Sequence, residues 1–171
     1  RGRELVVSNL PDGVVRAAAE FQTSLAELTK AIPLSPQQGR LYFARGLIRV
    51  MLSDPKSALE DFQRAIKLEP SPLRRAACFL EIGRVHQRAK RLPEALAAFD
   101  QSLSQNPRDT SVIRERADVL LLLDRFDEAI SGFTKFLELE GPVGDVYRAR
   151  GSAFAKSDKY READRKSTRL N

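Results

Sequence analysis

The chain has 171 residues and a formal net charge of +6, with 42% hydrophobic and 30% charged residues, no tryptophan and only 7% aromatic residues. This composition is typical of a charge-decorated helical protein, and it argues against a disordered chain and against a β-sandwich. The single cysteine and single histidine exclude an internal disulfide framework and a structural zinc site. No apolar run is longer than residues 119–123, which are too few to cross a membrane.

Residues 1–20 carry no assigned element, although residues 9–13 have the composition of a turn. Residues 21–38 are predicted to form the second helix of a degenerate repeat, because their sequence pattern lies in register with residues found 34 positions later. The matching positions are Phe21, Ser24, Leu28, Ala31 and Pro36, which correspond to Pro55, Ala58, Phe62, Ala65 and Pro70.

Three complete units follow, at 39–72, 76–109 and 110–143, and a truncated unit covers 144–165. Each complete unit has apolar residues spaced three and four apart on both sides of a short polar break, which predicts two helices. The breaks are predicted at 53–55, 90–93, 124–125 and, in the truncated unit, 158–159. A proline in each of the first two breaks suits the first turn of the helix that follows.

Small residues recur in two series that both step by 37, 34 and 34 residues. The first series is Gly46, Gly83, Ala117 and Gly151, and the second is Ala58, Ala95, Ala129 and Ala163. Because a larger side chain would force closely crossing helices apart, the two series predict tightly packed antiparallel helix pairs. Phe62, Phe99 and Phe133, each four residues after a second-series alanine, are predicted to fill the space between neighbouring pairs.

The first step is longer than the others, and its extra residues fall between Pro70 and Phe79. Ser71 suits a helix cap and Pro72 suits a first helical turn. The insertion is therefore predicted to lengthen the following helix by about one turn.

This pattern of glycine or alanine, alanine, phenylalanine and proline resembles the tetratricopeptide repeat family over roughly residues 21–165. The resemblance implies an all-α fold, a right-handed superhelix (α-solenoid) of antiparallel helix pairs. Residues 166–171 resemble a translated adapter sequence and are interpreted as a non-native tail, in which Ser167 replaces the expected apolar residue.

The sequence offers no catalytic constellation, so neither enzymatic activity nor a metal or cofactor is expected. His86 and Cys78 are interpreted as packing residues, because each is the single residue of its type and lies on a predicted first helix. The glycines at 46, 83 and 151 stand singly inside predicted helices, which does not form a phosphate-binding loop.

The resemblance implies instead a concave groove lined by the first helices, which binds a peptide or partner protein. By register its lining is Phe43, Leu47, Val50, Leu80, Arg84, Arg88, Arg114, Asp118, Leu121, Arg148, Ser152 and Lys156. The lining residues nearer the N-terminus are mainly apolar, and those nearer the C-terminus are mainly basic. This pattern predicts binding of a peptide with an apolar anchor near Phe43 and Leu47 and acidic groups near the four arginines. The alternative is that these arginines are solvated, or are paired with Glu81, Glu115 and Asp118.

Members of the family that bind the C-terminal tails of chaperones use a carboxylate clamp of lysine, asparagine and arginine. That clamp is absent from this sequence. The matching positions here are Phe43, Leu47, Glu81, Ser111 and Glu115. Three alternatives stay open: a docking or regulatory arm of a larger enzyme, self-association through the terminal pair, and an RNA-binding helical repeat. Nucleic acid is disfavoured, because RNA-binding units usually run one residue longer. A cytoplasmic location is favoured.

Overall fold

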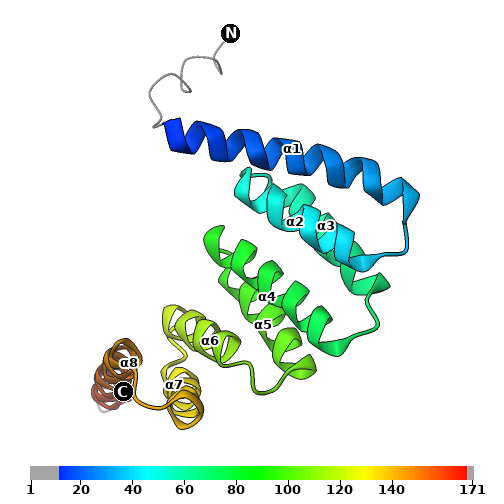
Figure 1. Ribbon diagram of the computed structural model, residues 1–171. Coiled ribbons are helices and arrows are strands. Elements are labelled where there is room, and N and C mark those ends of the chain that lie inside the picture. The colour runs from blue at the N-terminus through cyan, green and yellow to red at the C-terminus, as the bar shows by residue number, and fades with distance from the viewer. Residues whose placement is uncertain (1–11, 169–171) are drawn as a thin grey trace. The chain divides into compact units, whose positions relative to one another are not determined.

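The structure is a computed structural model that describes residues 12–168, and over these residues it contains eight α-helices and no strand (Figure 1). The helices are α1 (Asp12–Leu34), α2 (Gly39–Met51), α3 (Pro55–Leu68), α4 (Pro72–Arg88), α5 (Leu92–Gln105), α6 (Thr110–Leu122), α7 (Phe126–Glu140) and α8 (Gly144–Thr168). The chain divides into two compact units at the bond between Cys78 and Phe79, within α4. Residues 1–11 and 169–171, including most of the turn expected at 9–13, lie outside the described residues.

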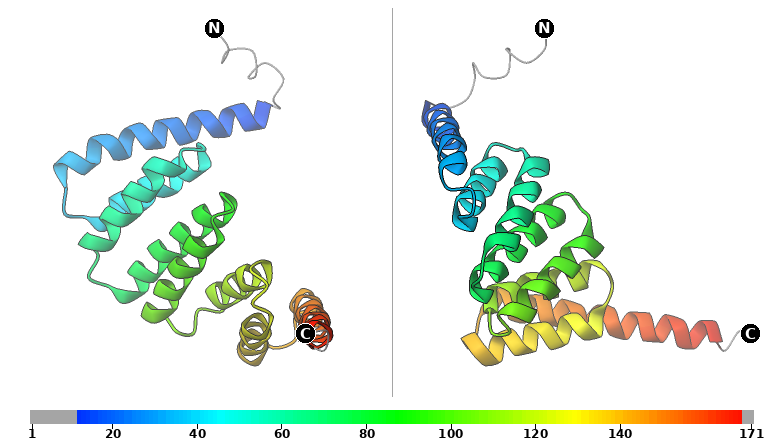
Figure 2. Two further views of the ribbon diagram at one scale, coloured as in Figure 1. Left: turned by 180° about the vertical axis from the view of Figure 1, so that it is seen from behind. Right: turned by 90° about the vertical axis from the view of Figure 1, so that its right-hand side faces the viewer.

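The first unit is built on the antiparallel pair of α2 and α3, with α1 packed along α2 (Figure 2). Its core centres on Phe62, which is completely buried together with Ala58 and Ala65 on the same face of α3. The ring of Phe43 on α2 lies against Phe62, with 5.8 Å between the ring centroids. The apolar stripe of α3 thus closes the pair, as its spacing predicts.

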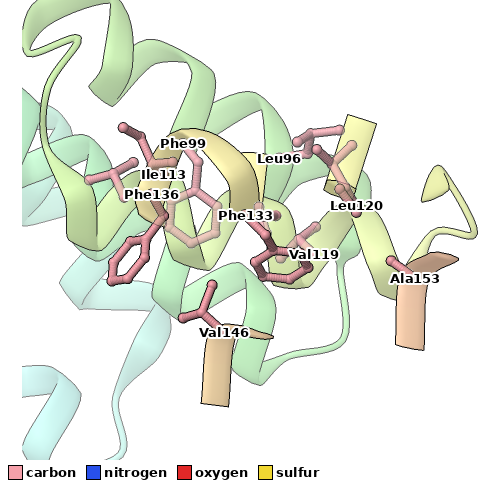
Figure 3. Packing of buried hydrophobic residues seen from close by; sticks show 13 residues of the cluster. Leu96, Phe99, Ile113, Val119, Leu120, Phe133, Phe136, Val146 and Ala153 are labelled. Atoms are coloured by element: carbon pink, nitrogen blue, oxygen red, sulfur yellow. The ribbon is translucent and has the colours of Figure 1, made fainter. Parts of the chain in front are cut away.

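The second unit stacks the last turns of α4 with α5, α6, α7 and the first half of α8. One hydrophobic cluster runs through it (Figure 3). Its larger members are Leu96, Phe99, Val112, Ile113, Val119, Leu120, Phe133, Phe136 and Val146. Phe99 and Phe133 have no exposed surface. The three phenylalanines were predicted to fill the space between neighbouring pairs, and the rings of Phe62 and Phe99 instead lie against Gly46 and Gly83 on the first helices of their own pairs.

Each complete helix pair is joined by the same tight turn. Ser53, Lys90 and Asp124 stand at equivalent repeat positions and adopt positive φ angles of 60°, 60° and 57°. The next backbone N–H donates to the carbonyl five residues earlier: Asp54 to Arg49 at 2.8 Å, Arg91 to His86 at 2.9 Å, and Arg125 to Leu120 at 2.9 Å. These are Schellman-type helix endings, in which left-handed backbone at one residue satisfies the carbonyls of the last turn.

The contacts made at the first series of small residues differ between successive helix pairs. A β-carbon at Gly46 would stand 2.6 Å from the ring of Phe62, and one at Gly83 would stand 2.4 Å from the ring of Phe99. In the third pair the first-helix residue is Ala117, and the glycine lies on the second helix as Gly132. At Gly151 nothing lies within 4 Å of an added β-carbon. The predicted close approach therefore holds for three pairs.

The structure confirms the all-α fold of antiparallel helix pairs and the breaks at 53–55, 90–93 and 124–125. It also confirms the longer helix after Pro70, because α4 has 17 residues whereas α2 and α6 have 13 each.

Two boundaries differ from the prediction. The helix expected over 21–38 begins at Asp12, so Asp12 and Gly13 are helical and do not form a turn. The break expected at 158–159 is wrong, because α8 continues to Thr168. A hairpin forms when its second helix buries an apolar face, and the chain has Ser167 where α3, α5 and α7 have phenylalanine.

Candidate functional site

The residues predicted to line a groove all lie on first helices, namely α2, α4, α6 and α8. None of the twelve is buried: Phe43, Leu47, Val50, Leu80, Arg84, Arg114, Asp118 and Leu121 are partly exposed, and Arg88, Arg148, Ser152 and Lys156 are exposed. The core phenylalanines of the second helices, by contrast, are fully buried. Buried hydrophobic residues come from first and second helices alike, so the predicted lining residues lie on a part of the first helices that stays accessible.

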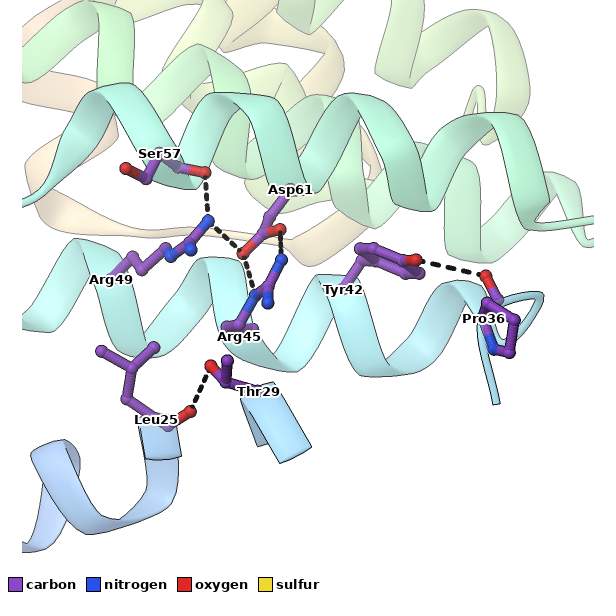
Figure 4. A network of polar contacts seen from close by, with 8 residues as sticks. All are labelled: Leu25, Thr29, Pro36, Tyr42, Arg45, Arg49, Ser57 and Asp61. Carbon is purple, nitrogen blue, oxygen red and sulfur yellow. Dashed lines mark hydrogen bonds and ion pairs between the residues drawn. The ribbon is translucent and has the colours of Figure 1, made fainter. Parts of the chain in front are cut away.

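In the first unit, α2 is fixed to α3 by a buried ion pair (Figure 4). The carboxylate of Asp61 accepts from Arg45 Nε at 2.9 Å and Nη2 at 2.7 Å, and from Arg49 Nη1 at 2.8 Å. Arg49 also donates to the carbonyl of Ser57 at 3.0 Å. The hydrogen bond to Asp61 raises the pKa of Arg45 against the opposing effect of burial. This network holds α2, and with it Phe43 and Leu47, in a fixed orientation.

A pocket of about 320 Å³ opens beside Phe43, between the start of α2, the end of α3 and the first turns of α4. Its lining residues are Gly39, Arg40, Phe43, Ala65, Glu69, Arg74, Ala77 and Cys78. Only Phe43 among these belongs to the groove lining predicted from the sequence. The insertion after Pro70 was the available signal for Arg74, since it lengthens α4 at the end where that residue lies.

In the second unit the centre of the first-helix face is a charge network. Arg84 donates to Glu115 on α6 through Nε at 2.9 Å and Nη2 at 2.5 Å, and to Glu81 on its own helix through Nη1 at 2.7 Å. The hydrogen bond to Glu115 is the main cause of a raised pKa for Arg84. Burial raises the pKa of neighbouring Asp118, and the positive charge of Arg114 opposes that rise. This part of the face has both signs of charge.

The four arginines of the predicted basic stretch are therefore in different situations. Arg84 is paired with two glutamates, and Arg148 is paired with Asp145 on the same helix. Arg114 lies near the carboxylate of Asp118. Arg88 is exposed and forms no ion pair with any residue that the structure describes. The expected pairing with Glu81 and Glu115 holds for Arg84. Arg148 pairs with Asp145, a carboxylate that the sequence reasoning did not name, and the exposure of Arg88 fits a solvated side chain as well as one open to a partner.

His86 and Cys78 are the single histidine and the single cysteine of the chain, and both lie on α4. Cys78 is 2% exposed and forms part of the pocket wall. His86 is partly buried, and its Nδ1 atom has no hydrogen-bond partner among the described residues. Burial and the charge of Arg91 lower the pKa of His86, while Glu94 opposes them. In the described part of the chain, no group of three or more His, Cys, Asp or Glu side chains is placed so that it could hold a metal ion. No helix in that part is both long enough and apolar enough to span a bilayer.

Two family models, each described as tetratricopeptide repeat, match residues 39–72 and 80–138. Among curated proteins, anaphase-promoting complex subunit 3 of Schizosaccharomyces pombe is 22% identical over 143 residues, which cover 84% of this chain and 21% of that protein. Mitochondrial import receptor subunit TOM70 of Homo sapiens is 24% identical over 132 residues, covering 75% of this chain and 22% of that protein. The chain thus spans about a fifth of the length of these relatives.

Solved structures show the same fold. The crystal structure of MamA superposes with a TM-score of 0.73 at 16% identity, covering 88% of this chain and 80% of that one. YrrB, described as a TPR protein with an unusual peptide-binding site, gives a TM-score of 0.70 at 21% identity over 85% and 74% of the two chains. The first TPR of Spaghetti (RPAP3), bound to the HSP90 peptide SRMEEVD, gives 0.63 at 14% identity over 70% and 92%.

Proposed function

The chain belongs to the tetratricopeptide repeat family, and on that premise we propose that it is a protein-interaction scaffold, which holds a peptide or partner protein on its first helices. The observation that carries the proposal is that all twelve side chains predicted to line this face are at least partly exposed. Phe43, Leu80 and Leu121 keep part of their apolar surface exposed in the folded chain. A bound partner could cover that surface. Two of the similar structures, YrrB and Spaghetti, are described with a peptide-binding site or a bound peptide.

An acidic partner is the finer form of this proposal. The net charge of +6 favours it, and Arg88 offers an exposed guanidinium on the first-helix face. Arg84 contributes less, because binding a partner carboxylate there would compete with Glu81 and Glu115. The contact with an acidic partner would be weakened by salt, as exposed charges are.

Tetratricopeptide scaffolds are in general not catalytic, and we propose the same of residues 12–168, in which binding is the whole activity. A docking or regulatory arm of a larger enzyme would use the same surface. Self-association is favoured by one observation: Tyr147 and Phe154 on α8 are 47% and 49% exposed and lie near the open space at Gly151.

The test compares two triple variants of the full chain in capture from a lysate of its source. Leu47→Glu, Leu80→Glu and Leu121→Glu together place charge on the first-helix face, while Gln63→Glu, Ala97→Glu and Gln101→Glu add the same charge to exposed positions of α3 and α5. We expect proteins retained by the wild type to be retained by the second variant and lost from the first. Equal retention by both would exclude the first-helix face, and ribonuclease-sensitive retention would favour the RNA-binding alternative. Circular dichroism checks that both variants fold.

A further inference from the structure

The pocket beside Phe43 is large enough to hold a large side chain. Its volume of about 320 Å³ lies at the lower end of the range for small-molecule sites, roughly 300–1,000 Å³. It is formed entirely by the first unit, from α2, α3 and the first turns of α4.

The floor of the pocket is apolar and firmly held. Ala65 and Cys78 are 1% and 2% exposed, and the partly exposed ring of Phe43 rests on buried Phe62. At one wall α2 begins in close contact with α3, since a β-carbon at Gly39 would stand 3.0 Å from the carbonyl oxygen of Ala65. An apolar group entering the pocket would therefore meet a preformed surface, which reduces the entropic cost of binding.

The rim carries one cation in excess. Glu69 is nearly buried, and its carboxylate accepts from the backbone N–H of Ser71 at 3.3 Å and lies 3.5 Å from Arg74 Nη1. Arg40 is exposed, and its Nε donates to Gln38 Oε1 at 3.0 Å. Arg40 has no carboxylate partner within the described residues. The negative charge of Glu69 is thus neutralised by Arg74 within the chain, whereas the positive charge of Arg40 is available to a ligand.

The insertion after Pro70 builds part of this pocket. By register the first helices of the other units begin at Gly39 and Thr110, which correspond to Ala76, but α4 begins at Pro72. Arg74 lies in this additional turn, and Ala77 and Cys78 follow it. The pocket therefore forms where the insertion after Pro70 lengthens the repeat. Neither Arg40 nor Arg74 is among the residues predicted to line the groove.

We propose that this pocket binds a large apolar side chain of a partner peptide whose neighbouring residue is acidic, with the acidic carboxylate pairing with Arg40. The inference rests on the proposed scaffold function and assigns it a specific anchor. Apolar contact with Phe43, Ala65 and Ala77 provides the affinity, and the charge-assisted hydrogen bond to Arg40 provides the preference for an acidic neighbour.

The test uses blocked decapeptides of alternating glycine and serine that carry Leu-Asp, Leu-Asn or Ala-Asp at the centre, titrated into isotopically labelled full chain and followed by amide NMR shifts. We expect the Leu-Asp peptide to shift amides of residues 39–43 and 74–78, and to bind roughly threefold to tenfold more tightly than the other two. Ala77→Phe, which fills the pocket, should abolish these shifts. Arg40→Gln should bind the Leu-Asp and Leu-Asn peptides equally.

Ala97→Phe and Arg108→Gln are the matched controls, because both positions are exposed and neither residue lines the pocket, and both should bind as the wild type does. Should Ala77→Phe fail to fold, Arg40→Gln at an exposed position still decides the question. Equal affinity for the three peptides, or shifts confined to other residues, would overturn the proposed peptide binding in this pocket. The scaffold function would still be tested separately by the capture experiment. Conversely, pocket binding together with equal capture by both triple variants would overturn only the first-helix face as the partner surface.

Discussion

The ring of Phe99 lies against the backbone of Gly83, so close that a β-carbon on Gly83 would stand 2.4 Å from the Cε1 atom of the ring. Phe99 is completely buried and belongs to a cluster that extends over the second unit, so its ring has no room to withdraw. The absence of a side chain at residue 83 is thus a condition for packing α4 on α5.

Gly83→Ala should lower the free energy of unfolding by roughly 1–3 kcal/mol, because the added methyl group overpacks a filled core. Gly151→Ala is the matched control at the equivalent repeat position, where nothing lies within 4 Å of the added carbon. There the change should stabilise α8 by up to about 1 kcal/mol through helix propensity. Urea denaturation measures both effects, and equal shifts for the two variants would contradict this account.

The third pair tests the same contact from the other side. A β-carbon at Gly132 would stand 2.8 Å from the β-carbon of Ala117, so Gly132→Ala should destabilise the chain by about 1–3 kcal/mol. In the Ala117→Gly background the clash is gone, and we expect Gly132→Ala to be close to neutral. A double-mutant cycle should give a coupling of about 1 kcal/mol or more between these residues; strict additivity would refute the contact.

Asp61 stabilises the first unit through its two arginines. Asp61→Ala should cost about 2–4 kcal/mol, because it leaves Arg45 and Arg49 partly buried without a counter-charge; their side chains are 15% and 21% exposed, which moderates the loss. Asp100→Ala removes a similar contact with Arg116, but that carboxylate is 49% exposed, so the cost should stay below about 1 kcal/mol. Denaturant titration of both variants provides the comparison. Losses of equal size would show that burial of the ion pair is not the deciding factor.

His86 makes stability depend on pH. Burial and the charge of Arg91 lower its pKa in the folded chain, so the unfolded chain binds a proton more readily. The stabilising contribution is fully present above about pH 6.5, the ordinary imidazole pKa, and is lost as the pH falls below that value. Between about pH 7 and pH 5, wild type should lose more stability than His86→Gln. Parallel pH profiles for the two proteins would contradict this.

Lys90 occupies a left-handed backbone conformation with φ of 60°, which costs a residue with a β-carbon roughly 1–2 kcal/mol. Lys90→Gly should therefore raise the free energy of unfolding by up to about 1 kcal/mol, after the entropic penalty of glycine is subtracted. Lys90→Ala, which keeps the β-carbon, is the control and should leave the midpoint of thermal unfolding nearly unchanged. A gain of the same size for alanine would assign the effect to the lost charge.

The repeat pattern predicted the fold because helix pairing depends on features that recur in the sequence. Small residues, phenylalanines and polar breaks appear at fixed spacing, and in the three complete pairs the structure places them at helix crossings, in the core and in turns. The prediction failed at 158–159, where a break resembles the others in composition but Ser167 removes the apolar face that would close a hairpin.

The candidate site was less accessible to sequence reasoning. The twelve residues that register predicts to line a groove lie on first helices, but register could not show that Arg84 pairs with Glu115, which lies 31 residues away on the next first helix. The pocket was missed for the same reason: Arg40 and Arg74 come together only through the packing of α2, α3 and α4. Such contacts depend on side-chain geometry, and no spacing in the sequence specifies them.

The additional turn of α4 shows how a repeat protein can gain an individual feature at small structural cost. Because the extra residues precede the first helical position shared by all units, the residues after them keep their phase relative to the neighbouring helices. Gly83 still faces Phe99, as Gly46 faces Phe62. Junctions between units are therefore positions where insertions can diversify recognition without disturbing the scaffold, and engineers could vary residues 71–75 as a cassette.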